Sequence, residues 1–324
     1  MGGWISPPAH QSRKDFLYME TNTQKTSSII LSHQRVAFES LLRIANATFF
    51  IQRKSFPLRP RSNTLIVGPS GSGKTHVARA VAAACNVPYL SITAGNWLLL
   101  GSGNRGGKAT WPLVCQFLRK NYSAEGVVIL IDEVDKISSS ATSSWDDHLR
   151  SELYGLLDLS IPEGISDSDG DMLDPSAVEK AQEVLSERCL LISAGAFQHI
   201  FEQRAQPKVG FGTEPEGASQ EPDLNELAQT IPRELANRFR SQLILLPPLK
   251  EADYRAMLQS VATKMPTHFQ QTFLRMGNAR MREAMRCRQG CRFLEELILD
   301  VVMEERSQLI TEQRQEIAVP PLSL

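Results

Sequence analysis

Short apolar runs alternate with longer amphipathic segments through the first three quarters of the chain. The runs are mostly continuous in hydrophobicity, which is typical of strands buried on both faces of a parallel sheet. They lie at residues 64–67, 89–92, 127–131, 189–192 and 243–246. The pattern predicts an α/β fold, a five-stranded parallel sheet covered by helices, with right-handed crossover connections.

Apolar residues at helical spacing lie between and after these runs. Helices are predicted within residues 30–51, at 111–120 and 145–157, and, where strand signals have ended, at 252–262, 269–287 and 293–310. We therefore expect a flexible segment at 1–26, a large α/β domain at 27–247 and a small all-helical domain at 248–324.

A glycine-rich segment follows the first apolar run directly. It reads Gly68, Pro69, Ser70, Gly71, Ser72, Gly73, Lys74, Thr75 and fits the pattern G-x-x-x-x-G-K-[ST]. In this pattern glycines let backbone N–H groups surround the phosphates, the lysine reaches the outer phosphates and the hydroxyl ligates Mg²⁺. The Ala-rich stretch behind the loop predicts a helix whose N-terminus favours anions. We expect this loop to bind ATP with Mg²⁺.

Two acids follow the third apolar run. Asp132 and Glu133 stand at the carboxyl end of a predicted buried strand, the edge at which the phosphate loop also lies. Asp132 is placed to hold the Mg²⁺ shell, and Glu133 to orient the attacking water. The pair indicates hydrolysis of ATP and not binding alone. Asp135 and Lys136 are assigned to a solvated helix start.

Composition narrows the classes of function. The chain has 324 residues, a formal net charge of -1 and a pI near 6.6, which gives no overall basic field for avid nonspecific nucleic-acid binding. No apolar run approaches the roughly 20 residues that span a bilayer, so we expect a soluble, cytoplasmic protein without membrane contact. The five cysteines lack the paired spacing of a zinc site. The stretches 160–175 and 203–223 are predicted surface insertions, the first of them a solvated acidic loop and not a calcium site.

The order of these motifs resembles the AAA+ ATPases, most closely the ClpX/HslU type of protein unfoldase. The resemblance runs from about residue 30 to residue 310 and rests on several segments. These are the phosphate loop, the Asp-Glu strand, the stretch 231–240 with Ile-Pro before Glu-Leu and Arg238, Gly-Cys-Arg at 290–292, Gly-Ala-Phe at 195–197, and Val-Gly-Phe-Gly at 209–212. Residues 30–33, beginning with Ile30 and Leu31, resemble the segment that packs on adenine.

The resemblance implies roles for two arginines. Arg238 corresponds to the finger that acts on the nucleotide of the neighbouring subunit, with Arg233 and Arg240 as rivals because this segment is one residue longer than the family pattern. Arg292 corresponds to the sensor that touches phosphate from the helical lid. An always charged, planar guanidinium suits both roles. An ordinary ion pair is the alternative for Arg238.

The resemblance also implies partners: a homo-oligomeric ring, by analogy a hexamer, a protein substrate, and a peptidase contacted through Val209, Gly210 and Phe211. The sequence departs from the family in three places. No zinc-binding domain is expected before the ATPase, the aromatic pore loop is replaced around Trp97, and the polar first-sensor residue is not evident near Ser193. Trp97 either grips a polypeptide or is buried for structural reasons.

The leading hypothesis is an ATP-hydrolysing ring protein that remodels or unfolds a protein substrate. The alternatives are a nucleic-acid-linked AAA+ ATPase, such as a loader, defence or mobile-element component, and an ATP switch that translocates nothing. The basic residues from Arg275 to Arg292 support the nucleic-acid alternative, but the run lacks lysine and interleaved aromatics.

Overall fold

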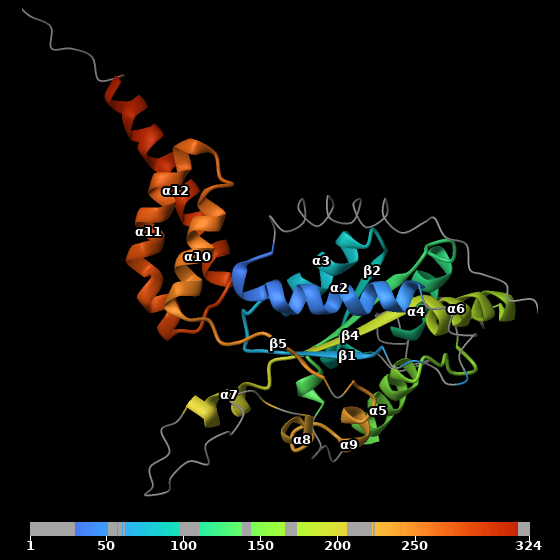
Figure 1. Cartoon of the computed structure of the whole chain (residues 1–324). Coiled ribbons are helices and arrows are strands. Elements are labelled where there is room, and N and C mark those ends of the chain that lie inside the picture. The colour runs from blue at the N-terminus through green and yellow to red at the C-terminus, as the bar shows by residue number, and fades with distance from the viewer. Residues whose placement is uncertain are drawn as a thin grey trace, which may run out of the picture.

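A five-stranded, all-parallel sheet forms the centre of the molecule (Figure 1). The computed structural model describes residues 30–50, 57, 60, 62–97, 110–137, 144–165, 174–205, 222, 224–240 and 242–316. The strands are β1 (Thr64–Val67), β2 (Tyr89–Thr93), β3 (Val127–Asp132), β4 (Cys189–Gly195) and β5 (Ile244–Leu245). Their order in the sheet is β2-β3-β4-β1-β5. The predicted fold class is confirmed.

The central strand β1 presents alternate side chains to two separate cores. Leu65 and Val67 pack into the apolar cluster on one face of the sheet, and Ile66 packs into the cluster on the other. All three side chains are fully buried. Burial on both faces explains why the runs read as continuous hydrophobic sequence.

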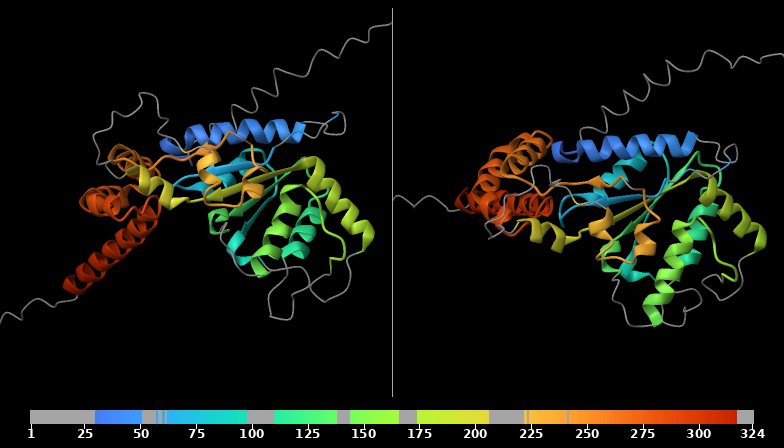
Figure 2. Two further views of the ribbon diagram at one scale, coloured as in Figure 1. Left: turned by 90° about the horizontal axis from the view of Figure 1, so that it is seen from below. Right: turned by 60° about the horizontal axis from the view of Figure 1, so that its bottom comes forward.

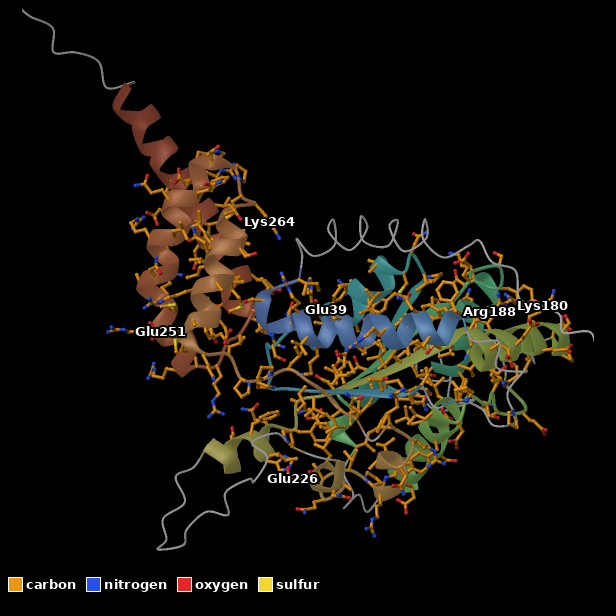
Figure 3. The ribbon with its side chains drawn as sticks, viewed as in Figure 1. Glu39, Lys180, Arg188, Glu226, Glu251 and Lys264 are labelled. Carbon is orange, nitrogen blue, oxygen red and sulfur yellow. The ribbon has the colours of Figure 1, made fainter. Side chains whose placement is uncertain are left out.

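Helices cover both faces of the sheet (Figure 2). On one face lie α2 (Arg35–Phe50) and α3 (Lys74–Ala84), and on the other lie α4 (Thr110–Lys120), α5 (Ser144–Leu157) and α6 (Pro175–Arg188). Apolar side chains at helical spacing anchor them, for example Phe38 and Leu41 of α2. Charged residues such as Glu39 and Lys180 project outward from the helices (Figure 3).

Three helices after the sheet have a core of their own. They are α10 (Glu251–Ala262), α11 (Thr267–Arg286) and α12 (Arg292–Glu316), and they gather beside the sheet in Figure 1. Buried residues from each helix meet in this core, among them Met257, Phe273 and Leu297. The three predicted terminal helices are therefore present, while the domain boundaries at residues 26 and 247 stay a prediction.

Short elements connect these parts. They are the 3₁₀ turns η1 (Ser32–Gln34), η3 (Ala94–Asn96) and η5 (Val134–Lys136), and the helices α7 (Gln198–Ala205), α8 (Leu224–Leu227) and α9 (Arg233–Ala236). Trp97 follows η3 and is 2% exposed, with its ring 6.1 Å from that of Trp111 and its indole N–H donating to Glu152 at 2.6 Å. Of the two alternatives for Trp97, the structure supports the buried, structural one. Residues 98–109 and the predicted docking residues Val209, Gly210 and Phe211 lie outside the described residues.

Candidate nucleotide site

The loop between β1 and α3 is a turn that only glycine allows at two positions. Gly71 and Gly73 have φ angles of 77° and 90°, in the left-handed region that disfavours other residues. A Cβ on Gly73 would lie 2.0 Å from Nε2 of Gln34. The loop ends at Lys74, where α3 begins, so the amino end of this helix points its free N–H groups at the loop.

Lys74 lies folded against its own loop. Its Nζ donates to the carbonyl oxygens of Gly68 and Pro69 at 2.8 and 3.1 Å. Burial lowers the pKa of Lys74, and the carboxylates of Asp132 and Asp135 oppose this effect. A phosphate entering the loop offers the ammonium a charged acceptor in place of two neutral carbonyls, so the residue is poised to bind an anion.

Thr75 and Asp132 meet at the carboxyl edge of the sheet. The Thr75 hydroxyl donates to Oδ2 of Asp132 at 2.6 Å. One hydroxyl and one carboxylate are oxygen ligands that suit Mg²⁺, which usually takes one or two carboxylates and completes its shell with phosphate and water. No group of three or more His, Cys, Asp or Glu residues forms a metal cage within the described part of the chain. The donor set therefore fits a Mg²⁺ ion that arrives with a nucleotide.

Glu133 adopts an unusual backbone conformation just past β3. Its φ of 60° lies in the left-handed region, and its amide donates to Oδ1 of Asp132 at 2.9 Å. Such a conformation costs on the order of 1–3 kcal/mol in a residue other than glycine and clusters at functional sites. The side chain is exposed, and its charge acts on Lys74. A carboxylate at this place is accessible to water beside the loop.

Two side chains from η1 hold the loop from outside. Nε2 of His33 and Nε2 of Gln34 each donate to the carbonyl of Ser72 at 3.1 Å. Gln34 is fully buried, and its Oε1 accepts from the amide of Leu31 at 3.3 Å. Gln34 was not predicted as a site residue, because a polar residue at a helix start carries no signal that it reaches a loop 38 positions away.

The segment resembling an adenine contact lies between the two parts of the molecule. Ile30 is 7% exposed and packs into the core under α2, whereas Leu31 packs against the core of α10–α12. Both residues thus lie next to the loop held by His33 and Gln34. Their predicted contact with a base stays a prediction.

The start of α12 sits directly on the loop. The amide of Cys291 donates to the carbonyl of Gly71 at 2.7 Å, and a Cβ on Gly290 would lie 2.4 Å from that same oxygen. Arg292 opens α12 one residue further on, and its charge lowers the pKa of Lys74. The charge of Arg292 thus acts on Lys74 together with the charges of Asp132 and Glu133.

Arg238 lies elsewhere, and it is paired. Its Nε donates to both carboxylate oxygens of Asp158 at 3.0 and 3.1 Å, and its guanidinium lies over the ring of Tyr154, 4.2 Å from the centroid. Its carbonyl accepts from Nδ2 of Asn63, the residue before β1. Asn63 marks the amino end of β1 and the phosphate loop follows its carboxyl end, so Arg238 lies at the opposite edge of the sheet.

One residue of the site contradicts its sequence-based assignment. Asp135, expected in a solvated helix start, is half-buried in the turn η5, and its Oδ1 lies 3.1 Å from where a Cβ of Gly195 would stand. Its carboxylate is one of the acids that act on Lys74.

Ser193 is fully buried in the middle of β4, with no hydrogen-bond partner for its Oγ among the described residues. The first-sensor position stays unassigned.

The basic run on α11 is partly neutralised by acids. Arg275 pairs with Glu304 and Arg280 with Asp300, both on α12. Arg286 pairs with Glu283 at 3.5 Å, and Arg288 pairs with Glu202 at 3.2 Å. Arg282 and Arg292 take part in none of the ion pairs among the described residues, so the run is neutralised in part.

Part of the sheet region is similar to a known protein family. Residues 64–166 match the model of the family described as ATPase family associated with various cellular activities (AAA). The match begins at β1 and includes the phosphate loop and the Asp132–Glu133 pair.

Several known proteins are similar to this chain over short segments. The peroxisomal ATPase PEX6 of Arabidopsis thaliana is 32% identical over 120 residues, which is 36% of this chain and 12% of that protein. Spastin of Naegleria gruberi is 37% identical over 84 residues, 26% of this chain and 15% of that protein. Proteasome-activating nucleotidase 2 of Haloferax volcanii is 36% identical over 88 residues, 26% of this chain and 19% of that protein. The similarity thus spans less than a fifth of each of these relatives.

None of the helices in the described ranges combines the length and the apolar character that crossing a membrane requires.

Proposed function

We propose that this chain, whose residues 64–166 match the model of the AAA ATPase family, hydrolyses ATP in a ring of its own copies and thereby remodels or unfolds a protein substrate. The observation that carries the proposal is the separation of Arg238 from the loop at Lys74. β1 is four residues long, which sets the two edges of the sheet roughly 13–16 Å apart. An arginine at the far edge does not reach the nucleotide of its own subunit.

The residues at the loop divide the chemistry of hydrolysis. Backbone N–H groups of residues 68–75 and Nζ of Lys74 bind the phosphates. Thr75 and Asp132 would hold a Mg²⁺ ion, which neutralises charge developing on the phosphates. Glu133 orients the attacking water and accepts its proton. Arg292 approaches the same phosphates from the helical part.

The neighbouring subunit completes the site. The side chain of Arg238 is 26% exposed, and it lies at an edge of the sheet that a second copy can present to the loop. An arginine supplied in trans typically contributes about 10³–10⁵ in turnover. Heterologous contacts of this kind close into rings, so hydrolysis depends on assembly.

Contact between the loop and the lid couples ATP hydrolysis to movement of the lid. The hydrogen bond from Cys291 to Gly71 joins α12 to the loop, so a change in the loop on phosphate release acts on α12. A protein substrate is favoured because one relative is named a proteasome-activating nucleotidase and because Arg275 and Arg280 of the basic run pair with acids of α12. A ClpX/HslU-type unfoldase with a peptidase partner is the more specific form of this proposal.

Mixing two inactive variants tests whether the site is shared. Lys74→Ala removes the phosphate contact and Arg238→Ala removes the finger, so each variant alone should lack ATPase activity. Mixed rings contain interfaces in which an intact loop faces an intact Arg238, and activity should return. Absence of recovery in rings shown to be mixed would overturn the shared site.

A second measurement identifies the substrate class. The ATPase rate is measured for the protein by itself, for the protein with an unfolded protein added, and for the protein with single- or double-stranded DNA added. Acceleration by unfolded protein supports remodelling, and acceleration by DNA alone supports the nucleic-acid alternative. A rate that none of these polymers changes supports the ATP switch.

A further inference from the structure

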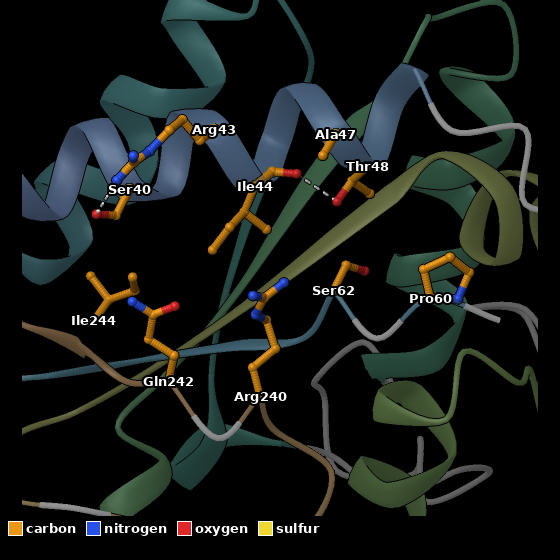
Figure 4. Close-up of a pocket in the computed structure, with 10 residues that line it drawn as sticks. All are labelled: Ser40, Arg43, Ile44, Ala47, Thr48, Pro60, Ser62, Arg240, Gln242 and Ile244. Atoms are coloured by element: carbon orange, nitrogen blue, oxygen red, sulfur yellow. Dashed lines mark hydrogen bonds between the residues drawn. The ribbon is translucent and has the colours of Figure 1, made fainter. Parts of the chain in front are cut away.

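A groove of about 360 Å³ lies between α2 and the edge strand β5 (Figure 4). Its walls come from segments far apart in sequence, namely the second half of α2, the residues before β1 and the residues around β5. The lining comprises Ser40, Arg43, Ile44, Pro60, Arg240 and Gln242, with Ala47, Thr48, Ser62 and Ile244. Its volume lies within the range of sites for small ligands.

The groove carries positive charge that no acid of the described residues neutralises. Arg240 rises from the β5 side toward α2 in Figure 4, and none of the ion pairs among the described residues involves its guanidinium. Arg43 makes one long hydrogen bond, 3.4 Å, to the hydroxyl of Ser40. None of the described residues that line the groove is an aspartate or a glutamate. In contrast, Arg238 two positions away is neutralised by Asp158.

The other lining groups complement an anion with several acceptor oxygens. The side chains of Ser40 and Gln242 supply neutral donors beside the guanidinium groups. Ile44 and Ile244 provide an apolar wall. Guanidinium forks bind phosphate in a bidentate manner, and a phosphate offers more acceptors than a carboxylate to a set of two arginines, a hydroxyl and an amide.

The groove is separate from the ATP site. Pro60 and Ser62 precede β1, and the amide of Arg240 donates to the carbonyl of Asn63, so the groove lies toward the amino ends of the strands. The phosphate loop lies at their carboxyl ends. One ligand does not occupy both.

We propose that this groove is a second phosphate-binding site, with Arg240 as its main contact and Arg43 as its second. The ligand is a phosphate-bearing molecule, either a free nucleotide or a nucleic-acid strand, whose less polar part lies against Ile44 and Ile244. The proposal does not depend on the subunit-shared ATPase mechanism.

Binding is measured by calorimetry on the full chain carrying Lys74→Ala, which weakens the loop and removes hydrolysis from the readout. The probes are inorganic phosphate, adenosine monophosphate, adenosine and a short single-stranded oligonucleotide. We expect adenosine monophosphate or the oligonucleotide to bind and adenosine not to bind. Tighter binding of the mononucleotide assigns a free nucleotide as the ligand, and tighter binding of the oligonucleotide assigns a nucleic-acid strand.

Substitutions locate the binding. Adding Arg240→Gln should weaken it at least 10-fold, and Arg240→Lys should weaken it less because the charge remains. Arg255→Gln removes an exposed arginine of α10 and is the matched control, which should bind like the parent. Unfolding temperatures of all variants confirm that they are folded.

Three results would overturn the proposal. The first is that no phosphate-bearing probe binds at millimolar concentration. The second is equal binding before and after Arg240→Gln. The third is that an acidic peptide displaces the bound probe with equal affinity, because the groove would then select negative charge and not phosphate.

Discussion

The amide of Cys291 lies 2.7 Å from the carbonyl oxygen of Gly71, so the segment that begins α12 touches the glycine-rich loop backbone to backbone. The contact is close because neither Gly71 nor Gly290 carries a Cβ. Both have positive φ angles, 77° and 62°. A side chain at either position would push the two segments apart. A substitution here therefore separates the start of α12 from the loop.

Gly290→Ala should weaken ATP binding and slow hydrolysis. Its new Cβ would lie 2.4 Å from the Gly71 carbonyl, and the left-handed backbone adds on the order of 1–3 kcal/mol of strain. We expect roughly 10-fold weaker nucleotide binding, measured by fluorescent nucleotide titration. Gly95→Ala is the control, since nothing lies within 4 Å of its added Cβ. Equal affinity in the two variants would mean that the contact does not serve the nucleotide.

Glu133→Gln should bind ATP normally and hydrolyse it at least about 10²-fold more slowly. The amide keeps the shape of the side chain but does not accept the proton of the attacking water. Single-turnover hydrolysis and retained radiolabelled ATP measure the two effects. Unchanged turnover would remove Glu133 from the mechanism.

Arg238→Ala should lower turnover by roughly 10³-fold or more while ATP binding is retained, as expected for a finger. Asp158→Asn is the matched comparison, because Arg238 keeps its contacts with the Tyr154 ring and with the Glu234 carbonyl at 2.8 Å. A role limited to the ion pair predicts similar small losses in both variants. Steady-state ATPase assays on assembled protein separate these outcomes.

Stability should fall between neutral and mildly acidic pH because of His33. Burial lowers the pKa of this imidazole below its ordinary value of 6.5. Its Nε2 donates to Ser72, and its buried Nδ1 has no hydrogen-bond partner in the described structure. The unfolded chain therefore takes up a proton near pH 6.5 that the folded chain takes up only at lower pH, so stability is complete above pH 6.5 and decreases below it.

Unfolding temperatures at pH 8.0 and pH 5.5 measure this effect. His33→Gln keeps a donor for Ser72 but does not titrate, so the difference between the two pH values should be smaller than in the parent. His268→Gln changes an exposed histidine of α11 and should leave the difference unaltered. An identical pH dependence in the parent and His33→Gln would contradict the prediction.

Local pattern was sufficient for most of the fold. The strand at residues 64–67 has its predicted bounds, because continuous apolar sequence is dictated by burial on both faces. The predicted strand at 243–246 is shorter, Ile244–Leu245, since it pairs with β1 alone and Pro247 provides no N–H for a ladder.

One crossover helix was missed although the sequence contains its start signal. Asp174 caps α6, its side chain accepting from the amide of Ser176, and Pro175 stands at the first helical position. Residues 160–175 were predicted to be an acidic surface insertion, so Asp174 and Pro175 were not interpreted as a helix start. Ala181, Val184 and Leu185 then follow at helical spacing and are buried against the sheet.

The site was predictable where it follows a strand and not where it depends on packing. Lys74, Thr75 and Asp132 come together because parallel strands end at one edge. Gln34, Asp135 and Asp158 reach their partners through tertiary contacts between segments distant in sequence. No local pattern encodes such contacts.

Gln34 makes contacts with segments 38 and 257 positions away, through the Ser72 carbonyl and the Cys291 sulfur. The partners of Gln34 are therefore made at different times during synthesis of the chain. Ser72 and Gln34 are synthesised early, but β1 pairs with β4 and β5, which come later in the chain. Cys291 follows 219 residues after Ser72, or roughly 10–45 s later at 5–20 residues per second. The site around the loop is therefore completed only when nearly the whole chain has been made, because its strand partners and its contact with Cys291 all come from the later part of the sequence.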